Sequence, residues 1–257
     1  MIAPREKGKS GRAGLLPAVE RFSKRQRVEH LIILLLFFFL VLTGFPQKYH
    51  DTLWAGWVVI VLGGLDLVHW FHRMAGLMFS VFLVYYVTTV SFSIIRGRKA
   101  ASLVPFPADV NDILQSLLWY VGLRDRPQTP VFDYRQKFEF WGLFFGGLVM
   151  AVTGLMLYFP LWTTLWLPGI FIPAAKTAHS YEALVALLVI VIWHLYHTVL
   201  RPSVFPLDKT MLTGRMSLER LKEEHPLEYA RLFPGEGEGM EEGKGSPGGT
   251  PAPSSPA

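Results

Sequence analysis

One apolar stretch in the C-terminal half decides the fold. Residues 177–200 read TAHSYEALVALLVIVIWHLYHTVL. A helix of about 20 such residues crosses the hydrocarbon core of a bilayer, which is roughly 30 Å thick. The stretch carries His179, His194 and His197, and ionisable side chains inside a membrane span are costly and usually mark a functional site. It therefore predicts a membrane helix that carries a function.

Three more apolar stretches resemble it in length. Hydrophobic residues make up 51% of the 257-residue chain, which is high for a soluble domain. A shorter run, 53–65, contains three glycines and is too short to span by itself, so we expect it to lie at the interface or to lead into the second span. The sequence predicts an all-α membrane protein, a four-transmembrane-helix bundle with short interfacial helices. Its expected spans are 28–45, 71–95, 138–159 and 177–200.

The basic residues predict how the bundle is oriented. Residues 1–27 hold 8 of the 25 Lys and Arg, residues 96–137 hold 7 and residues 201–257 hold 7, whereas the other connections hold only 3. Because basic loops stay in the cytoplasm, both termini should be cytoplasmic in a bacterial-type inner membrane. This bias explains the net charge of +5 and gives no reason to expect nucleic acid as a partner.

The absence of cysteine limits the chemistry. Disulfides, thiolate-bound zinc, iron–sulfur clusters and covalently attached c-type haem all need cysteine, and the chain has none. We divide the chain into a flexible N-terminal tail (1–20), a four-helix domain (21–233) and a disordered tail (234–257) that is rich in Gly, Pro, Ser and Glu. No internal repeat is visible in the sequence.

Four histidines form two pairs on this topology. His30 and His194 fall at the cytoplasmic ends of spans one and four, and His72 and His179 at the outer ends of spans two and four. Neutral histidine is an iron ligand, so the pattern predicts two b-type haems. The 15 residues between His179 and His194 correspond to a rise of about 22 Å in a regular helix. His197 would lie about 27 Å along, near the membrane edge, so we prefer His194.

Other interpretations of the histidines stay open. A single histidine near the end of a span is more often an interfacial or hydrogen-bonded residue than a ligand. A haem-free membrane anchor and a His-lined metal transporter are the alternatives from other functional classes. The roles of His69 and Glu182, each one turn from an expected ligand, are also open.

Four short motifs stand in or beside the expected spans: Arg-Val-Glu-His at 27–30, His-Arg-Met-Ala-Gly at 72–76, Asp-Tyr-Arg-Gln-Lys at 133–137 and Trp-His-Leu-Tyr at 193–196. They resemble the cytochrome b (gamma) subunit of respiratory formate dehydrogenases and its relatives in hydrogenases and thiosulfate reductases, over residues 21–233. The resemblance implies two b haems, one ligated from spans one and four and the other from spans two and four. The two ligands on span four are one residue further apart here than in the family, which predicts either a local bulge or a role for His197.

The same resemblance implies a quinone site beside the cytoplasmic haem. Its candidates are Asp133, Gln136 and Lys137, at the entry to span three. The competing interpretation is structural, because Asp133 followed by Gln136 has the spacing of a helix capping box. The implied function is electron relay between an outward-facing partner and a quinone pool, either menaquinone or ubiquinone. An iron–sulfur or multihaem subunit and a catalytic subunit would sit on the outer face, since this chain has no substrate dehydrogenase site.

Overall fold

The computed structural model describes residues 18–97, 103–104, 106–125, 132 and 134–234, so most of the expected tails 1–20 and 234–257 lies outside this set. The described part is almost entirely helical, which confirms the all-α class. The helices begin four to six residues earlier than the apolar runs suggested; polar first turns account for this in the first and third spans. Four helices are long and apolar enough to cross a membrane: Lys24–Lys48, Leu65–Ile95, Tyr134–Tyr158 and Phe171–Leu200.

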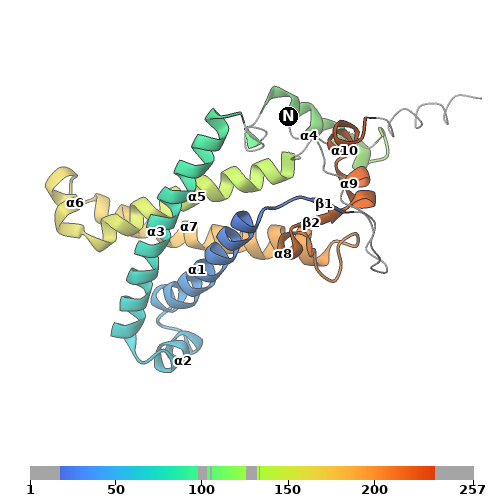
Figure 1. The fold of residues 1–257 in the computed structure, drawn as a ribbon. Coiled ribbons are helices and arrows are strands. Elements are labelled where there is room, and N and C mark those ends of the chain that lie inside the picture. The colour runs from blue at the N-terminus through green and yellow to red at the C-terminus, as the bar shows by residue number, and fades with distance from the viewer. Residues whose placement is uncertain (1–17, 98–102, 105, 126–131, 133, 235–257) are drawn as a thin grey trace, which may run out of the picture.

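The four long helices form two hairpins (Figure 1). In each hairpin a short helix joins two long ones, and the long helices pack along each other. Each short helix lies at the turn of its own hairpin, and the two turns are well apart in Figure 1; we call the part of the bundle nearer to these turns the loop end. The first hairpin is α1 (Lys24–Lys48), α2 (Leu53–Val61) and α3 (Leu65–Ile95), and the second is α5 (Tyr134–Tyr158), α6 (Pro160–Trp166) and α7 (Phe171–Leu188).

Local signals set the starts of α1 and α3. Ser23 caps α1 through a capping box with Gln26, whose side chain accepts from the Ser23 backbone N–H at 3.0 Å. Gly63 and Gly64 precede α3 with φ of 91° and 105°, a backbone region that only glycine adopts easily. These glycines separate α2 from α3, so the short run is a helix of its own.

The fourth span is not a regular α-helix throughout. After α7 the chain continues as two π-helical segments, η2 (Val189–His194) and η3 (Tyr196–Leu200). A π turn bonds i to i+5 and so contains one residue more than an α turn. The local bulge that the family spacing suggested is confirmed, and the expectation of regular helical geometry from His179 to His194 is wrong.

Apolar side chains cover the outside of the long helices. Leu35, Val81, Phe138 and Ile192 are all exposed on this chain. Large apolar side chains do not face water over such an extent in a soluble protein. This exposure agrees with four helices whose outer faces contact lipid.

A small cap closes the opposite end of the bundle, which we call the terminal end. Ala18–Glu20 form strand β1, which pairs antiparallel with β2 (Arg215–Ser217). The last residues of the expected N-terminal tail 1–20 are therefore structured, and this part of the domain prediction is wrong. The sequence did not indicate this strand, because three residues are too few to show a strand pattern. The cap also contains α8 (Thr210–Thr213), α9 (Leu218–Glu224) and α10 (Pro226–Leu232), and a further helix, α4 (Pro107–Tyr120), lies at the same end (Figure 1).

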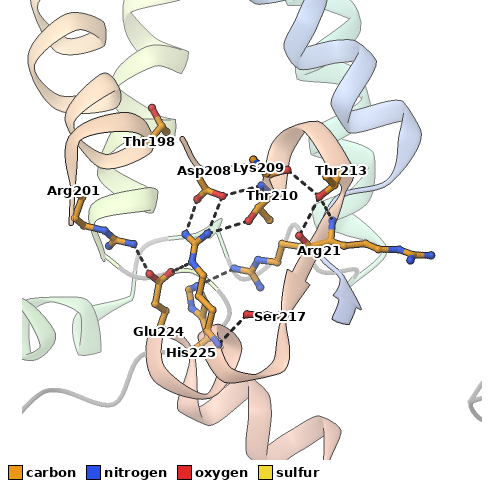
Figure 2. Close-up of polar contacts among 12 residues, drawn as sticks. Arg21, Thr198, Arg201, Asp208, Lys209, Thr210, Thr213, Ser217, Glu224 and His225 are labelled. Atoms are coloured by element: carbon orange, nitrogen blue, oxygen red, sulfur yellow. Dashed lines mark hydrogen bonds and ion pairs between the residues drawn. The ribbon is translucent and has the colours of Figure 1, made fainter. Parts of the chain in front are cut away.

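An ion network fastens the cap to the end of η3. Arg220 donates to both carboxylate oxygens of Asp208, at 2.8 and 2.6 Å, and its Nε lies 3.2 Å from Glu224. Glu224 also binds Arg201, just after η3, and these groups converge in Figure 2. Burial alone would raise the pKa of Asp208, but hydrogen bonds from Arg220 and Thr210 lower it to about 2.

We expect Asp208→Asn to loosen the cap. The pKa of Asp208 is lowered from 3.8 to about 2, so its ionised form stabilises the fold by about 2 kcal/mol. That contribution is complete above pH 4 and is lost as the pH falls towards 2. Hydrogen exchange in α8 to α10 should quicken in the variant at neutral pH, whereas Glu219→Gln, at an exposed position, should leave it unchanged. Equal exchange in the two variants would contradict the role of Asp208.

Candidate functional site

Two imidazoles meet near the loop end. His72 comes from the first turns of α3 and His179 from α7, and their ring centres lie 6.3 Å apart. The rings are nearly perpendicular, with an interplanar angle of 88°. We call them the loop-end pair. The structure thus brings together the two residues that were expected to form the outer pair.

A threonine hydroxyl determines which nitrogen of His72 carries the proton. Thr43 on α1 donates its only hydroxyl hydrogen to the Phe39 carbonyl, at 2.7 Å. Its oxygen lies 3.0 Å from His72 Nδ1 and can therefore only accept there. The Nδ1 of His72 is protonated, and Nε2 keeps its lone pair.

The second hairpin repeats this arrangement. Thr153 on α5 donates to the Val149 carbonyl at 2.6 Å, and its oxygen lies 2.9 Å from His179 Nδ1. The two rings of the loop-end pair are therefore held in the same tautomer by equivalent threonines. The hairpins share this feature although the sequence suggested no internal repeat, because a Thr-Gly dipeptide and one histidine are too short to stand out.

A glycine beside each threonine makes room for the ring. A Cβ added at Gly44 would lie 2.8 Å from His72 Cε1, and one added at Gly154 would lie 3.2 Å from His179 Cε1. Even alanine would push the rings from these positions. In each Thr-Gly dipeptide, the threonine positions the histidine ring by a hydrogen bond and the glycine by a close contact.

A second pair lies towards the terminal end. His30 on α1 and His194 at the end of η2 have ring centres 6.2 Å apart, with an interplanar angle of 31°. We call them the terminal-end pair. His197 lies against Trp193 and its Nδ1 is 2.8 Å from the Trp193 carbonyl. The geometry pairs His30 with His194, the residue that the sequence favoured over His197.

The π-helical segment accounts for the position of His194. In a regular helix each residue turns the chain by about 100°, so one additional residue would rotate His194 away from the face it shares with His179. The wider turns of η2 absorb that residue. The segment therefore keeps both histidines of the fourth span directed into the bundle. π-helical turns occur frequently at functional sites.

Carboxylates surround the terminal-end pair. Glu139 on α5 contacts His194 Nδ1 through its Oε1, and its side chain is 19% exposed. Glu29, next to His30 in the chain, is buried, accepts from the Tyr85 hydroxyl at 2.7 Å and lies 3.3 Å from Arg25. Sequence reasoning missed these contacts, because Glu139 has no motif that assigns it to a partner 55 residues away.

The expected quinone residues are only partly described. Asp133 lies outside the described residues. Gln136 is in the first turn of α5, and Lys137 is buried with its Nζ 2.7 Å from Asp109 Oδ1. The start of α5 lies beside the fourth span, since the rings of Phe138 and Trp193 are 6.3 Å apart. The entry to the third span is therefore next to His194, as expected.

The sequence left the roles of Glu182 and His69 open, and the structure places both outside the two imidazole pairs. Glu182 is directed at Gly146 of α5, where a Cβ would collide with its carboxylate. His69 lies close enough to His72 for their charges to interact. Within the described part of the chain, no three His, Asp or Glu side chains gather in a group suited to a metal ion. The site consists of two separate imidazole pairs.

Comparison with known proteins places the chain in a family. The family model described as prokaryotic cytochrome b561 matches residues 21–214, which includes all four paired histidines. None of the curated proteins matches the chain.

Removing one residue from η2 should be tolerated. Deletion of Val191 should convert the π turn into an α turn. The ring of His194, one position earlier in the shortened chain, should then stay opposite His30. Insertion of an alanine after Val191 should rotate that ring by about 100° and separate the pair. Optical spectra of the haem expected at this pair would test both changes. Retention after insertion but loss after deletion would contradict the π-helical account.

Proposed function

The chain belongs to the prokaryotic cytochrome b561 family, and from that premise we propose that it is the di-haem cytochrome b subunit of a respiratory oxidoreductase complex. Membership makes it a membrane protein that binds b-type haem and transfers electrons. The proposal adds that it holds two haems and relays electrons between an outward-facing partner and the quinone pool. The geometry of the two imidazole pairs carries it.

The residues present fit two haems. Two imidazoles that bind one iron from opposite sides, each at about 2 Å, have ring centres roughly 6 Å apart. The two pairs are spaced at 6.2 and 6.3 Å. In the loop-end pair the threonines leave Nε2 of both rings free to bind. His72 and His179 would hold one haem, and His30 and His194 the other.

The chain's own residues prepare each site. Thr43 and Thr153 fix the tautomer of their histidines, and such outer partners orient a ligand and raise its basicity. Gly44 and Gly154 let the rings approach the helices. When bound, each haem supplies a one-electron carrier. The fourth span contributes one histidine to each pair, so a single helix links the two membrane faces.

Quinone exchange is proposed beside the terminal-end pair. The support is the position of the α5 entry next to His194 together with the polar residues Asp133 and Gln136 there. Lys137 binds Asp109, so we assign it a structural part in that entry rather than direct contact with the quinone. A buried quinone oxygen needs a hydrogen-bond donor, and Gln136 can supply one.

The surrounding complex is proposed from the resemblance to formate dehydrogenase gamma subunits. The terminal end, with both termini, would face the cytoplasm of a bacterial-type inner membrane, because the basic residues gather there. The loop end would meet an iron–sulfur or multihaem subunit that works with a catalytic subunit. A His-lined metal transporter is disfavoured, because its ligands would have to gather around one ion and the described histidines form separate pairs.

Counting haem tests the proposal. Pyridine haemochrome analysis of the purified chain should give two b haems per polypeptide. His179→Ala should leave one haem, at the terminal-end pair, and His194→Ala should leave the other. His197→Ala is the matched control and should keep both. One haem in the wild-type protein, or loss of a haem in the control alone, would overturn the assignment.

Quinone turnover tests the location of the exchange site. An unmade hydrogen bond to a buried oxygen costs on the order of 1 to 3 kcal/mol, so Asp133→Ala and Gln136→Ala should slow haem oxidation by a quinone analogue by roughly tens of fold. Both haem spectra should stay intact. Asn111→Ala, an exposed change in α4, should have no effect. If a variant with both changes oxidises its haem at the wild-type rate, the quinone site lies elsewhere, most plausibly at the loop end.

A further inference from the structure

The two histidine pairs differ in what holds their outward ring nitrogens. In the loop-end pair, Nδ1 of each ring meets a neutral threonine oxygen, at 3.0 and 2.9 Å. In the terminal-end pair, Nδ1 of His194 meets the carboxylate of Glu139. Among the partners that the described residues provide for these four rings, Glu139 is the one that carries a negative charge.

The charged side chains near Glu139 have partners of their own, so its carboxylate is directed at the rings of the terminal-end pair. The nearest basic side chain on its own helix, Lys137, binds Asp109 at 2.7 Å. Glu139 contacts His194, and the ring centre of His30 lies 6.2 Å from that of His194, so the carboxylate is close to both rings. The buried acid next to His30 in the chain, Glu29, is paired with Arg25. The second carboxylate of the bundle interior, Glu182, is directed at Gly146 and not at a ring nitrogen.

A carboxylate partner changes the properties of a ligating imidazole. When the ring N–H donates to an anion, the other nitrogen becomes more basic and a stronger ligand. Such a ligand favours the more highly charged ferric state, so outer hydrogen bonding shifts the reduction potential of a haem. The interaction is stronger away from water, and the Glu139 side chain is only 19% exposed.

We propose that Glu139 is a positioning residue that holds His194 and lowers the reduction potential of the haem bound by His30 and His194, separating it from that of the other haem. This rests on the proposed two-haem function. Glu139 also fixes the ring orientation that η2 makes possible, since the start of α5 lies beside η2, where the ring centres of Phe138 and Trp193 are 6.3 Å apart. The two sites of one bundle therefore differ by the charge of a single hydrogen-bond partner.

Potentiometric titration of Glu139→Gln tests the proposal. Glutamine keeps an acceptor oxygen but removes the charge. The variant is made both in the full protein and with His179→Ala, where only the terminal-end haem remains. At the wild-type midpoint, the ratio of reduced to oxidised terminal-end haem should rise roughly fivefold, because charge-assisted hydrogen bonds are stronger than neutral ones. The loop-end haem should keep its potential. Glu139→Asp, which keeps the negative charge, should leave the potential of the terminal-end haem close to the wild-type value.

The matched control is Glu182→Gln, which removes an interior carboxylate that faces no ring nitrogen. It should leave the potential of the terminal-end haem unchanged. If Glu139→Gln reduces haem occupancy but leaves the potential of the remaining terminal-end haem unchanged, Glu139 has only a structural role and the proposal fails. If both haems bind and neither potential moves, the proposal fails while the two-haem function stands. A wild-type protein without two haems would instead defeat the proposed function itself.

Discussion

Two hydrogen bonds between threonine and histidine determine what the bundle can bind. Each threonine gives its hydroxyl hydrogen to the carbonyl four residues earlier, so its oxygen can only accept from the ring. The lone pair of each imidazole is then on Nε2. Without this constraint the rings could adopt either tautomer, and the pair would have no defined nitrogen for a metal. The close packing of α1 with α3 and of α5 with α7 places these groups together.

The sequence predicted the spans and the pairing of histidines well, for physical reasons. Twenty apolar residues have few alternatives to a membrane helix, and histidines at the ends of such helices must fall at one face or the other. The structure places His194 beside His30, and the choice of His194 over His197 as a haem ligand stays a prediction. The π-helical turn was suggested only by the unusual spacing, since no residue in 189–194 requires it.

Other features could not be predicted from the sequence because they depend on tertiary contacts. Glu139 and His194 are 55 residues apart and come together only when α5 packs on the fourth span. The strand pairing of β1 with β2 joins segments from opposite ends of the chain, and three residues carry too little pattern to indicate a strand. Thr43 and Thr153 did have a signal, a Thr-Gly dipeptide in the first span of each hairpin, but its meaning depends on the position of the histidine.

The β1–β2 pairing has a consequence for how the protein is made. β1 precedes all four spans in the chain, whereas β2 follows the last span by about 15 residues. β1 must therefore wait for all four spans to be made before it finds its partner. Closure of the cap is thus an intrinsic marker that the four spans are in place, and a chain truncated after the fourth span would leave β1 without β2.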